Sequence, residues 1–297
     1  MKLETNLTWG QIAEILEIDH DVQTTGDAIR KAIARRNETS DITIPPPIAY
    51  PLAPMLNIDY RNVLVLYDIH AGYHHTEFIT QMVKLARIAK IDTVVTDADI
   101  FDFDSLSRYT KTSKQTELND DLEIAGKMLY WLGNYFRIFM IDANHGARMK
   151  KKLNQPLDLQ RIVSMALNGR NANVTATNRE YMGMDDFVFA HPSEMSSTII
   201  GKVPAQLVQK YGKNVLTGHT HKRGHTYVGS KIALEVGCCI NGENVAYKQE
   251  TVNAYGGFML GAALIIDGEI FHFDDKGNTH LNGNLKKDFK FWERRFK

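Results

Sequence analysis

Residues 63–70 read VLVLYDIH, so five largely apolar side chains run directly into Asp68 and His70. An unbroken run of this length, rich in branched and aromatic residues, is typical of a strand that is buried on both faces. Side chains alternate in direction along an extended segment, so Asp68 and His70 are expected on the same side, where both can reach one ion. An Asp-x-His at the surface end of a strand would give the same pattern.

Four further clusters repeat this arrangement of an apolar run that ends at metal-ligating side chains. They are Asp99 and Asp102 after residues 93–96, Asn144 and His145 after 138–141, His191 after 187–190, and His219 and His221 after 214–217. Carboxylates, imidazoles and an amide oxygen suit a pair of hard to borderline divalent metals, and such a pair is suited to cleaving phosphate esters. Open α/β sheets place their sites at the carboxyl ends of strands, where all five clusters are expected.

Each cluster also has an interpretation without a metal. Acidic residues after strands often cap helices, and Asp97 competes with Asp99 for the same role. Asn144 could belong to a turn and His191 to the core, and the Gly-His-Thr-His stretch could be a chance pair in a chain with 11 histidines. The occurrence of all five clusters in one order, each after a predicted strand, favours a shared metal site.

The segments between the first clusters predict an α/β fold. Residues 76–90 and roughly 115–135 have the spacing of helices, and they separate strands predicted at 63–67, 93–96 and 138–141. This alternation argues for a parallel or mixed sheet with helical crossovers.

The chain beyond residue 174 is richer in predicted strands. Later strands are expected at 232–236 and 262–266, and Asp267-Gly268 is a strong signal for a tight hairpin turn after the second of these. No internal repeat or low-complexity segment is visible.

Residues 1–36 differ from the rest and predict a small helical segment. Two short amphipathic helices with a turn between them, the second one basic, suggest a helix-turn-helix. Residues 37–57 contain five of the eight prolines and predict an extended linker, which leaves 58–297 as the main domain.

The bulk composition limits the possible settings and partners. The 35 basic and 35 acidic residues cancel, so any contact with nucleic acid must be local. The two cysteines are adjacent and form no Cys-x-x-Cys motif, which argues against a thiolate zinc site and fits a reducing setting. No signal-peptide pattern or membrane-spanning apolar run is present, so we expect a cytoplasmic protein that does not contact membranes. The chain could also form a homo-oligomer.

The order of the five clusters resembles the calcineurin-like metallophosphoesterase superfamily. That family's pattern is Asp-x-His, Gly-Asp-x-x-Asp, Gly-Asn-His-Asp/Glu, a lone His and Gly-His-x-His, and the resemblance covers about residues 60–270. The chain departs from it at Ala98 and Ala143, where the family has glycine, and at Gly146, where it has an acidic residue. The resemblance implies an α/β, four-layer sandwich of two mixed β-sheets flanked by helices.

The resemblance also implies a dinuclear hydrolase in which metal-activated water attacks a phosphate ester. One ion would be held by Asp68, His70, Asp99 and His221, and the other by Asp99, Asn144, His191 and His219. Asp102 would support the site, and His145 would protonate the leaving group. Arg148 would grip a phosphate oxygen, or else form a surface ion pair. The mixed oxygen and nitrogen ligand set suits Mn²⁺ most, with iron or Zn²⁺ as alternatives.

The substrate is indicated only by weaker features at the two ends of the chain. Basic side chains that could meet the phosphates of DNA or RNA are Arg30, Lys31, Arg35 and Arg36, and in the C-terminal tail Lys286, Lys287, Lys290, Arg294, Arg295 and Lys297. The tail interleaves them with Phe289, Phe291, Trp292 and Phe296, which could stack on bases or pack on the body.

These features favour a nuclease or another phosphodiesterase. A phosphomonoesterase or small-molecule phosphodiesterase, acting on nucleotides or phosphoproteins, is the main alternative. A DNA-binding module with a structural metal site is a further one. His74 and His75 could line the substrate mouth or simply belong to an exposed loop.

Overall fold

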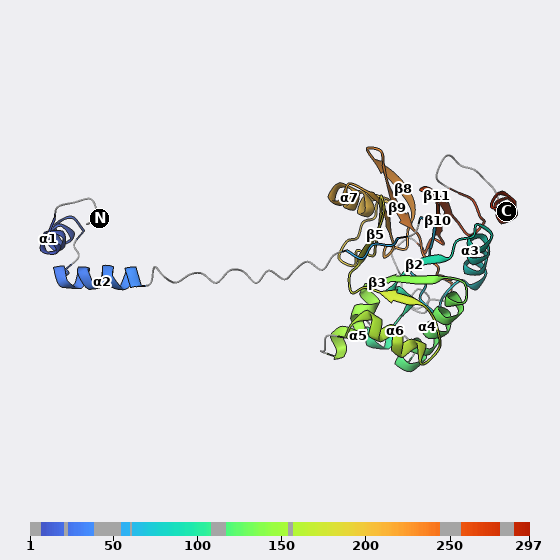
Figure 1. Cartoon of the computed structure of the whole chain (residues 1–297), viewed down its shortest axis with the longest axis horizontal. Coiled ribbons are helices and arrows are strands. Elements are labelled where there is room, and N and C mark those ends of the chain that lie inside the picture. The colour runs from blue at the N-terminus through green and yellow to red at the C-terminus, as the bar shows by residue number, and fades with distance from the viewer. Residues whose placement is uncertain are drawn as a thin grey trace. The chain divides into compact units, whose positions relative to one another are not determined.

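The computed structural model describes residues 7–20, 23–38, 55–59, 61–107, 117–153, 157–243, 257–279 and 288–297 (Figure 1). The chain divides into two compact units, Met1–Ala53 and Pro54–Lys297. The second unit carries all five clusters of predicted site residues.

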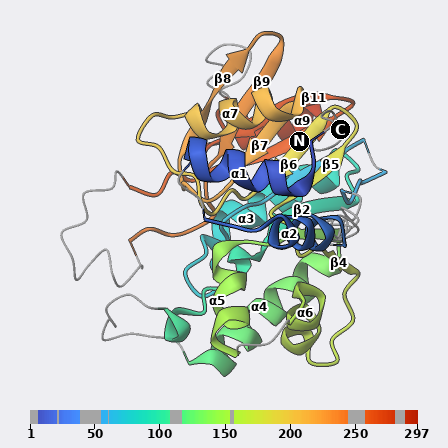
Figure 2. The same cartoon turned by 90° about the vertical axis from the view of Figure 1, so that its left-hand side faces the viewer.

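The first unit contains two helices, α1 (Trp9–His20) and α2 (Gly26–Glu38), whose axes cross steeply (Figures 1 and 2). The start of α1 is a capping box, because the amide of Thr8 donates to Gln11 Oε1 at 2.8 Å and the amide of Gln11 donates to Thr8 Oγ1 at 3.4 Å. The two helices approach closely at Gly26, where a Cβ atom would lie only 2.7 Å from the backbone of Trp9. Both predicted helices are therefore present, and the DNA-binding role of the pair stays a prediction.

The second unit is built on two mixed sheets. The six-stranded sheet has the order β11-β10-β1-β2-β3-β4, and the five-stranded sheet has the order β5-β6-β7-β9-β8. In the first, β1 (Val63–Val65), β2 (Thr93–Asp97), β3 (Arg137–Ile141) and β4 (Val174–Ala176) are parallel. Beside β1, β10 (Ala262–Ile266) runs antiparallel to it, and β11 (Glu269–Phe273) pairs antiparallel with β10 at the edge. In the second, β6 (Phe187–Ala190), β7 (Asn214–Thr217) and β9 (Lys231–Val236) are parallel, with β5 (Tyr181–Met184) and β8 (Arg223–Val228) antiparallel at the edges.

Helices cover the outer face of each sheet. A large apolar core joins the six-stranded sheet to α3 (Thr76–Ile88), α4 (Leu118–Gly133), α6 (Leu159–Leu167) and α9 (Phe289–Arg295). A smaller core joins the five-stranded sheet to α7 (Lys202–Tyr211), and a third lies between the two sheets. Figure 1 shows the strands between α7 on one side and α4 and α6 on the other. This arrangement confirms the predicted α/β four-layer sandwich.

The helices and strands predicted from the sequence lie within a few residues of their expected positions. The turn at Asp267-Gly268 joins β10 to β11 as predicted, with both residues left-handed at φ 49° and 83°. The first strand is shorter than predicted, because its ladder ends at Val65. Among the described helices none is long and apolar enough to cross a membrane.

The C-terminal helix packs on the body. Trp292 is buried, its indole N–H donates to the carbonyl of Gly277 at 3.0 Å, and its ring contacts Phe271 and Phe273. The indole is therefore not a surface on which a base could stack, and the alternative in which the aromatic run packs on the body is the one observed.

Candidate metal centre

The carboxyl ends of five strands, three in one sheet and two in the other, bring the predicted ligands together. Asp68 and His70 follow β1, Asp99 and Asp102 follow β2, Asn144 and His145 follow β3, His191 follows β6, and His219 and His221 follow β7. Because β1, β2 and β3 belong to one sheet and β6 and β7 to the other, the site forms where the two sheets meet.

Four of these residues have a left-handed backbone. Asp68, His70, His219 and His221 have φ angles of 48°, 43°, 78° and 55°. This conformation costs roughly 1 to 3 kcal/mol at each non-glycine residue, and such strain clusters at functional sites. The expectation that Asp68 and His70 share one side of an extended segment is therefore wrong, since the chain turns sharply at both residues.

One group of ligand atoms combines residues from both sheets. Asp68, His70 and His221 each offer an atom within 4.8 Å of the others, and His221 Nε2 lies 3.4 Å from Asp68 Oδ1. His70 Nε2 is buried without a hydrogen-bond partner among the described residues, and it lies 3.8 Å from Asp99 Oδ2. A buried nitrogen without a partner is costly, and a divalent cation in this position would satisfy it.

A second group forms around Asn144. Its Oδ1 lies 2.8 Å from His191 Nε2 and 3.0 Å from His219 Nδ1. His191 Nε2 is also 3.4 Å from Asp99 Oδ2. Ligand atoms that are each about 2.1 Å from one ion lie roughly 3 to 3.5 Å apart, so this spacing suits a shared ion. Asp99 Oδ2 lies near both groups.

Two further carboxylates hold the histidines in orientation. Asp102 Oδ1 lies 2.7 Å from His70 Nδ1, and Asp97 Oδ2 lies 2.9 Å from His191 Nδ1. A carboxylate that accepts from one ring nitrogen leaves the other free for a metal. Asp97 thus orients a histidine, which is a different role from that of Asp99. The sequence suggested only that the two carboxylates compete for one role.

The buried carboxylates make the site strongly attractive to cations. Burial opposes protonation of His70, but its hydrogen bond to Asp102 and the nearby carboxylates raise its pKa to about 9. Burial likewise opposes a charge on His191, yet Asp99 and Asp97 raise its pKa to about 10. Burial, followed by the charge of Asp68, raises the pKa of Asp97 to about 7. The donor set therefore fits divalent cations, which would supply the positive charge that the carboxylates favour.

His145 lies in the first turn of α5 (Asn144–Leu153), at the edge of both groups. Its backbone amide donates to Asp99 Oδ1 at 3.1 Å, and its Nδ1 lies 2.7 Å from the carbonyl oxygen of Asp102. Because a carbonyl can only accept, Nδ1 carries the hydrogen and Nε2 is left without one. Burial, followed by the charge of His70, holds the pKa of His145 well below its usual value. Arg148 donates to the same carbonyl at 2.8 Å.

One departure from the family pattern, Gly146, has a packing explanation. A Cβ atom at Gly146 would lie 2.9 Å from Ala98 Cβ and 2.9 Å from Asp142 Oδ1. A side chain at 146 would therefore crowd the side chains of Ala98 and Asp142. Gly218 is required for a similar reason, because a Cβ atom there would lie 2.8 Å from Asp97 Oδ2 and 2.9 Å from Asp68 Oδ2.

A buried carboxylate that the sequence analysis missed supports the turn between His219 and His221. Glu235 in β9 accepts from the hydroxyl of Thr220 at 2.9 Å and from the amide of Gly201 at 2.8 Å. Its only sequence signal is a single acidic residue inside an otherwise apolar strand.

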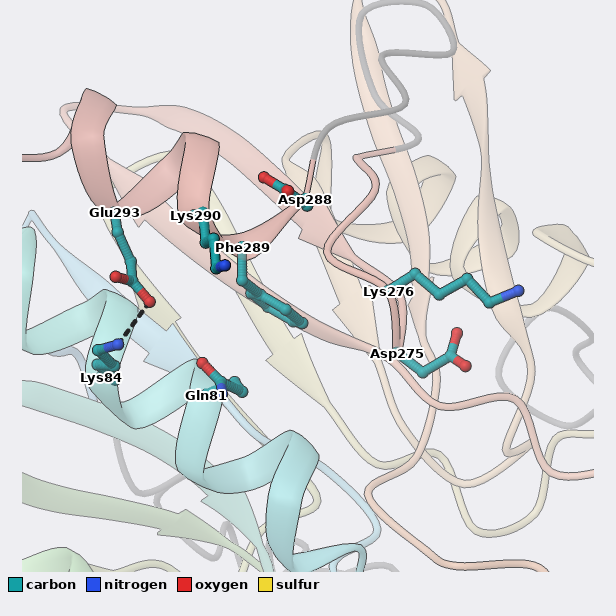
Figure 3. Close-up of a pocket in the computed structure, with 8 residues that line it drawn as sticks. All are labelled: Gln81, Lys84, Asp275, Lys276, Asp288, Phe289, Lys290 and Glu293. Atoms are coloured by element: carbon teal, nitrogen blue, oxygen red, sulfur yellow. Dashed lines mark hydrogen bonds and ion pairs between the residues drawn. The ribbon is translucent and has the colours of Figure 1, made fainter.

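The two histidines that follow the first cluster have local structural contacts. His75 Nδ1 accepts from the amide of Phe78 and caps α3, and His74 Nδ1 accepts from the amide of Gly72. A pocket of about 370 Å³ elsewhere on the surface contains none of the predicted ligands (Figure 3). It lies beside α3 and α9, which are joined by an ion pair of 2.6 Å between Lys84 and Glu293.

Comparisons with known proteins found solved structures of low sequence identity. No family model and no curated protein matches the chain. A Streptococcus pneumoniae TIGR4 protein described as a predicted phosphoesterase is 11% identical, with a TM-score of 0.34, and the match covers 75% of this chain and 94% of that one. A single mutant of Vps29 from Entamoeba histolytica is 15% identical, with a TM-score of 0.38 and the same coverages. Vps29 from Cryptosporidium parvum is 13% identical, with a TM-score of 0.35, and covers 72% of this chain and 98% of its own.

The chain resembles the calcineurin-like metallophosphoesterases. That statement rests on the order of the five clusters and on the four-layer sandwich that carries them, because similarity at these identities and TM-scores is too low to indicate an activity. Within the described residues, the buried groups of aspartate and histidine are able to hold metal ions.

Proposed function

We propose that this protein is a dinuclear metal-dependent phosphoesterase that hydrolyses phosphodiesters, with DNA or RNA as the substrate class. The observation that carries the proposal is the position of Asp99, whose Oδ2 lies 3.8 Å from His70 Nε2 and 3.4 Å from His191 Nε2. One carboxylate between two separate ligand groups is the arrangement that a bridged metal pair needs.

The assignment of ligands follows the two groups. Asp68, His70, Asp99 and His221 would hold one ion, and Asp99, Asn144, His191 and His219 the other. Neither of the two cysteines belongs to the groups of side chains that could hold a metal. Oxygen and nitrogen donors without thiolates favour Mn²⁺, with iron and Zn²⁺ as alternatives.

The chain's own side chains position the reaction. When bound, the metal pair lowers the pKa of a coordinated water and offsets the negative charge of the phosphate. Asp102 fixes His70 through its carboxylate, and its backbone carbonyl fixes His145. An anionic phosphate beside His145 favours a proton on Nε2, from which it can pass to the leaving oxygen. Arg148, held by the same carbonyl, can donate to a phosphate oxygen.

Basic residues outside the centre support a nucleic-acid substrate. Arg30 and Lys31 on α2 are exposed, although both pair with Asp27 at 2.6 Å and 2.9 Å, which reduces their free charge. Lys290 and Arg294 on α9 add positive charge on the second unit.

The test compares esters of different kinds. Purified protein with Mn²⁺ is incubated with bis-p-nitrophenyl phosphate, with p-nitrophenyl phosphate, and with labelled single-stranded DNA, duplex DNA and RNA. We expect the bis-ester and at least one polynucleotide to be cleaved, with activity lost in EDTA and restored by Mn²⁺. Cleavage of the monoester alone would favour a phosphatase, and metal binding without cleavage of any ester would favour a structural metal site.

A further inference from the structure

Helix α5 begins inside the metal centre and runs away from it. Its first residue, Asn144, supplies the amide oxygen that lies near His191 and His219. Its last turn carries three consecutive lysines, Lys150, Lys151 and Lys152. A single rigid element therefore connects the candidate catalytic site to a concentration of positive charge.

The cationic side chains lie on the same face of α5 as Asn144. At 3.6 residues per turn, Asn144, Arg148, Lys151 and Lys152 fall within a sector of about 100°. The opposite face contains Gly146 and Met149, both buried. The stripe thus faces away from the core, with Arg148 about 6 Å and the two lysines about 10 to 12 Å along the helix axis from Asn144.

Lys151 and Lys152 differ from Lys150 in their surroundings. Lys150 Nζ donates to Asp142 Oδ2 at 2.5 Å and to Asn178 Oδ1 at 3.1 Å, so its charge is compensated. Lys151 and Lys152 are exposed, and neither has an ion-pair partner among the residues that the structure describes. Lysines in a last turn also stabilise the helix through its dipole, so the experiment must separate that effect from binding.

We propose that the stripe formed by Arg148, Lys151 and Lys152 is a track that binds the backbone of a polynucleotide on one side of the scissile phosphate. The inference rests on the proposed function, because the metal centre would take the scissile phosphate. Arg148 then meets the phosphate group at the centre, and the two lysines meet phosphates farther along the same strand. A small ester ends before it reaches Lys151, so the lysines distinguish a polymer from a small substrate.

The test is the double variant Lys151→Glu/Lys152→Glu. The ratio of kcat/KM for a 20-nucleotide substrate to kcat/KM for bis-p-nitrophenyl phosphate should fall by about tenfold or more. Binding of the same oligonucleotide in EDTA, measured by fluorescence anisotropy, should weaken, and the slope of log affinity against log salt should drop by about 1.4 to 1.8 for two lost contacts. The binding assay does not depend on turnover, so it can fail separately from the proposed function.

Lys210→Glu is the matched control. Lys210 is also an exposed lysine in the last turn of a ten-residue helix, α7, on the other sheet of the sandwich. It reverses one charge, against two in the double variant, so it should lose a similar interaction with the helix dipole for each lysine replaced and leave oligonucleotide affinity and its salt slope at the wild-type values. Wild-type affinity and salt slope in the double variant would overturn the track, as would an equal loss of affinity in Lys210→Glu.

Discussion

The two halves of the metal centre differ in what holds them. The six-stranded sheet supplies His70, Asn144 and the carboxylates, which are buried and bound by backbone amides, as when Asp68 accepts from the amide of His219 and Asp99 from that of His145. The five-stranded sheet supplies imidazoles, and one of them, His191, is oriented by Asp97 of the opposite sheet. Each group of ligands includes residues from both sheets, so neither sheet can form the site alone.

This difference predicts a gradient of mutational effects. A residue shared by both ligand groups should matter most, followed by His145, the proton donor. The carboxylates that orient single histidines should come next, and Glu235, which supports one turn, should matter least.

Asp99→Asn should have the largest effect. It weakens the carboxylate assigned to both ions, so kcat should fall by about a thousandfold or more. Hydrolysis of bis-p-nitrophenyl phosphate measures the rate, and circular dichroism checks that the fold persists. A variant that keeps more than about a tenth of the wild-type rate would speak strongly against the assignment.

His145→Ala should come next. Loss of a proton donor typically costs about 10²- to 10⁴-fold in rate. Because His145 is not assigned as a ligand, the Mn²⁺ content of the variant, measured by elemental analysis, should match the wild type. A large loss of metal would instead make His145 a ligand or a support for the ligands.

Asp97→Asn and Asp102→Asn compare the two ligand groups directly. Each should weaken metal binding by about 10- to 100-fold, as is usual when the acid behind a ligating histidine is removed. Titration with Mn²⁺ followed by calorimetry measures both affinities. The Asp97 variant should affect the ion near His191 and the Asp102 variant the ion near His70. Identical effects on both ions would show that the two ligand groups are not separable.

Glu235→Gln should have the smallest effect, because Glu235 acts on the metal centre only through the turn at Thr220. Half-saturation with Mn²⁺ should rise by about threefold to tenfold, with a smaller change in kcat at saturating metal. Thr220→Val should reproduce the effect and Thr220→Ser should restore wild-type behaviour. A wild-type metal requirement in Thr220→Val would remove the proposed link between Glu235 and the turn.

The sequence predicted the features that depend on local pattern. Strand ends, the helices α1 to α4 and the hairpin at Asp267 follow from apolar runs and turn residues, which are properties of neighbouring positions, whereas α5, α6, α7 and α9 were not predicted. The contacts of Asp97 and Glu235 could not be predicted in this way. His191 lies 94 positions from Asp97, and only the meeting of two sheets brings them together.

The backbone turns at Asp68 and His70 show the same limit. An apolar strand followed by Asp-x-His suggests continued extension, whereas the observed left-handed conformations are stabilised by distant partners. The amide of Asp68 donates to Asp97 and the amide of His70 to the carbonyl of Asp99. Tertiary hydrogen bonds outweigh the local preference here, as is usual at strained functional sites.

The most direct test of the dinuclear centre is the Mn²⁺ content of the purified chain at saturation, measured by elemental analysis and electron paramagnetic resonance. We expect about two ions per chain in the wild type, magnetically coupled through Asp99, and a loss of that coupling in Asp99→Asn. A wild-type chain that binds a single ion, or none, at saturating Mn²⁺ would contradict the central claim.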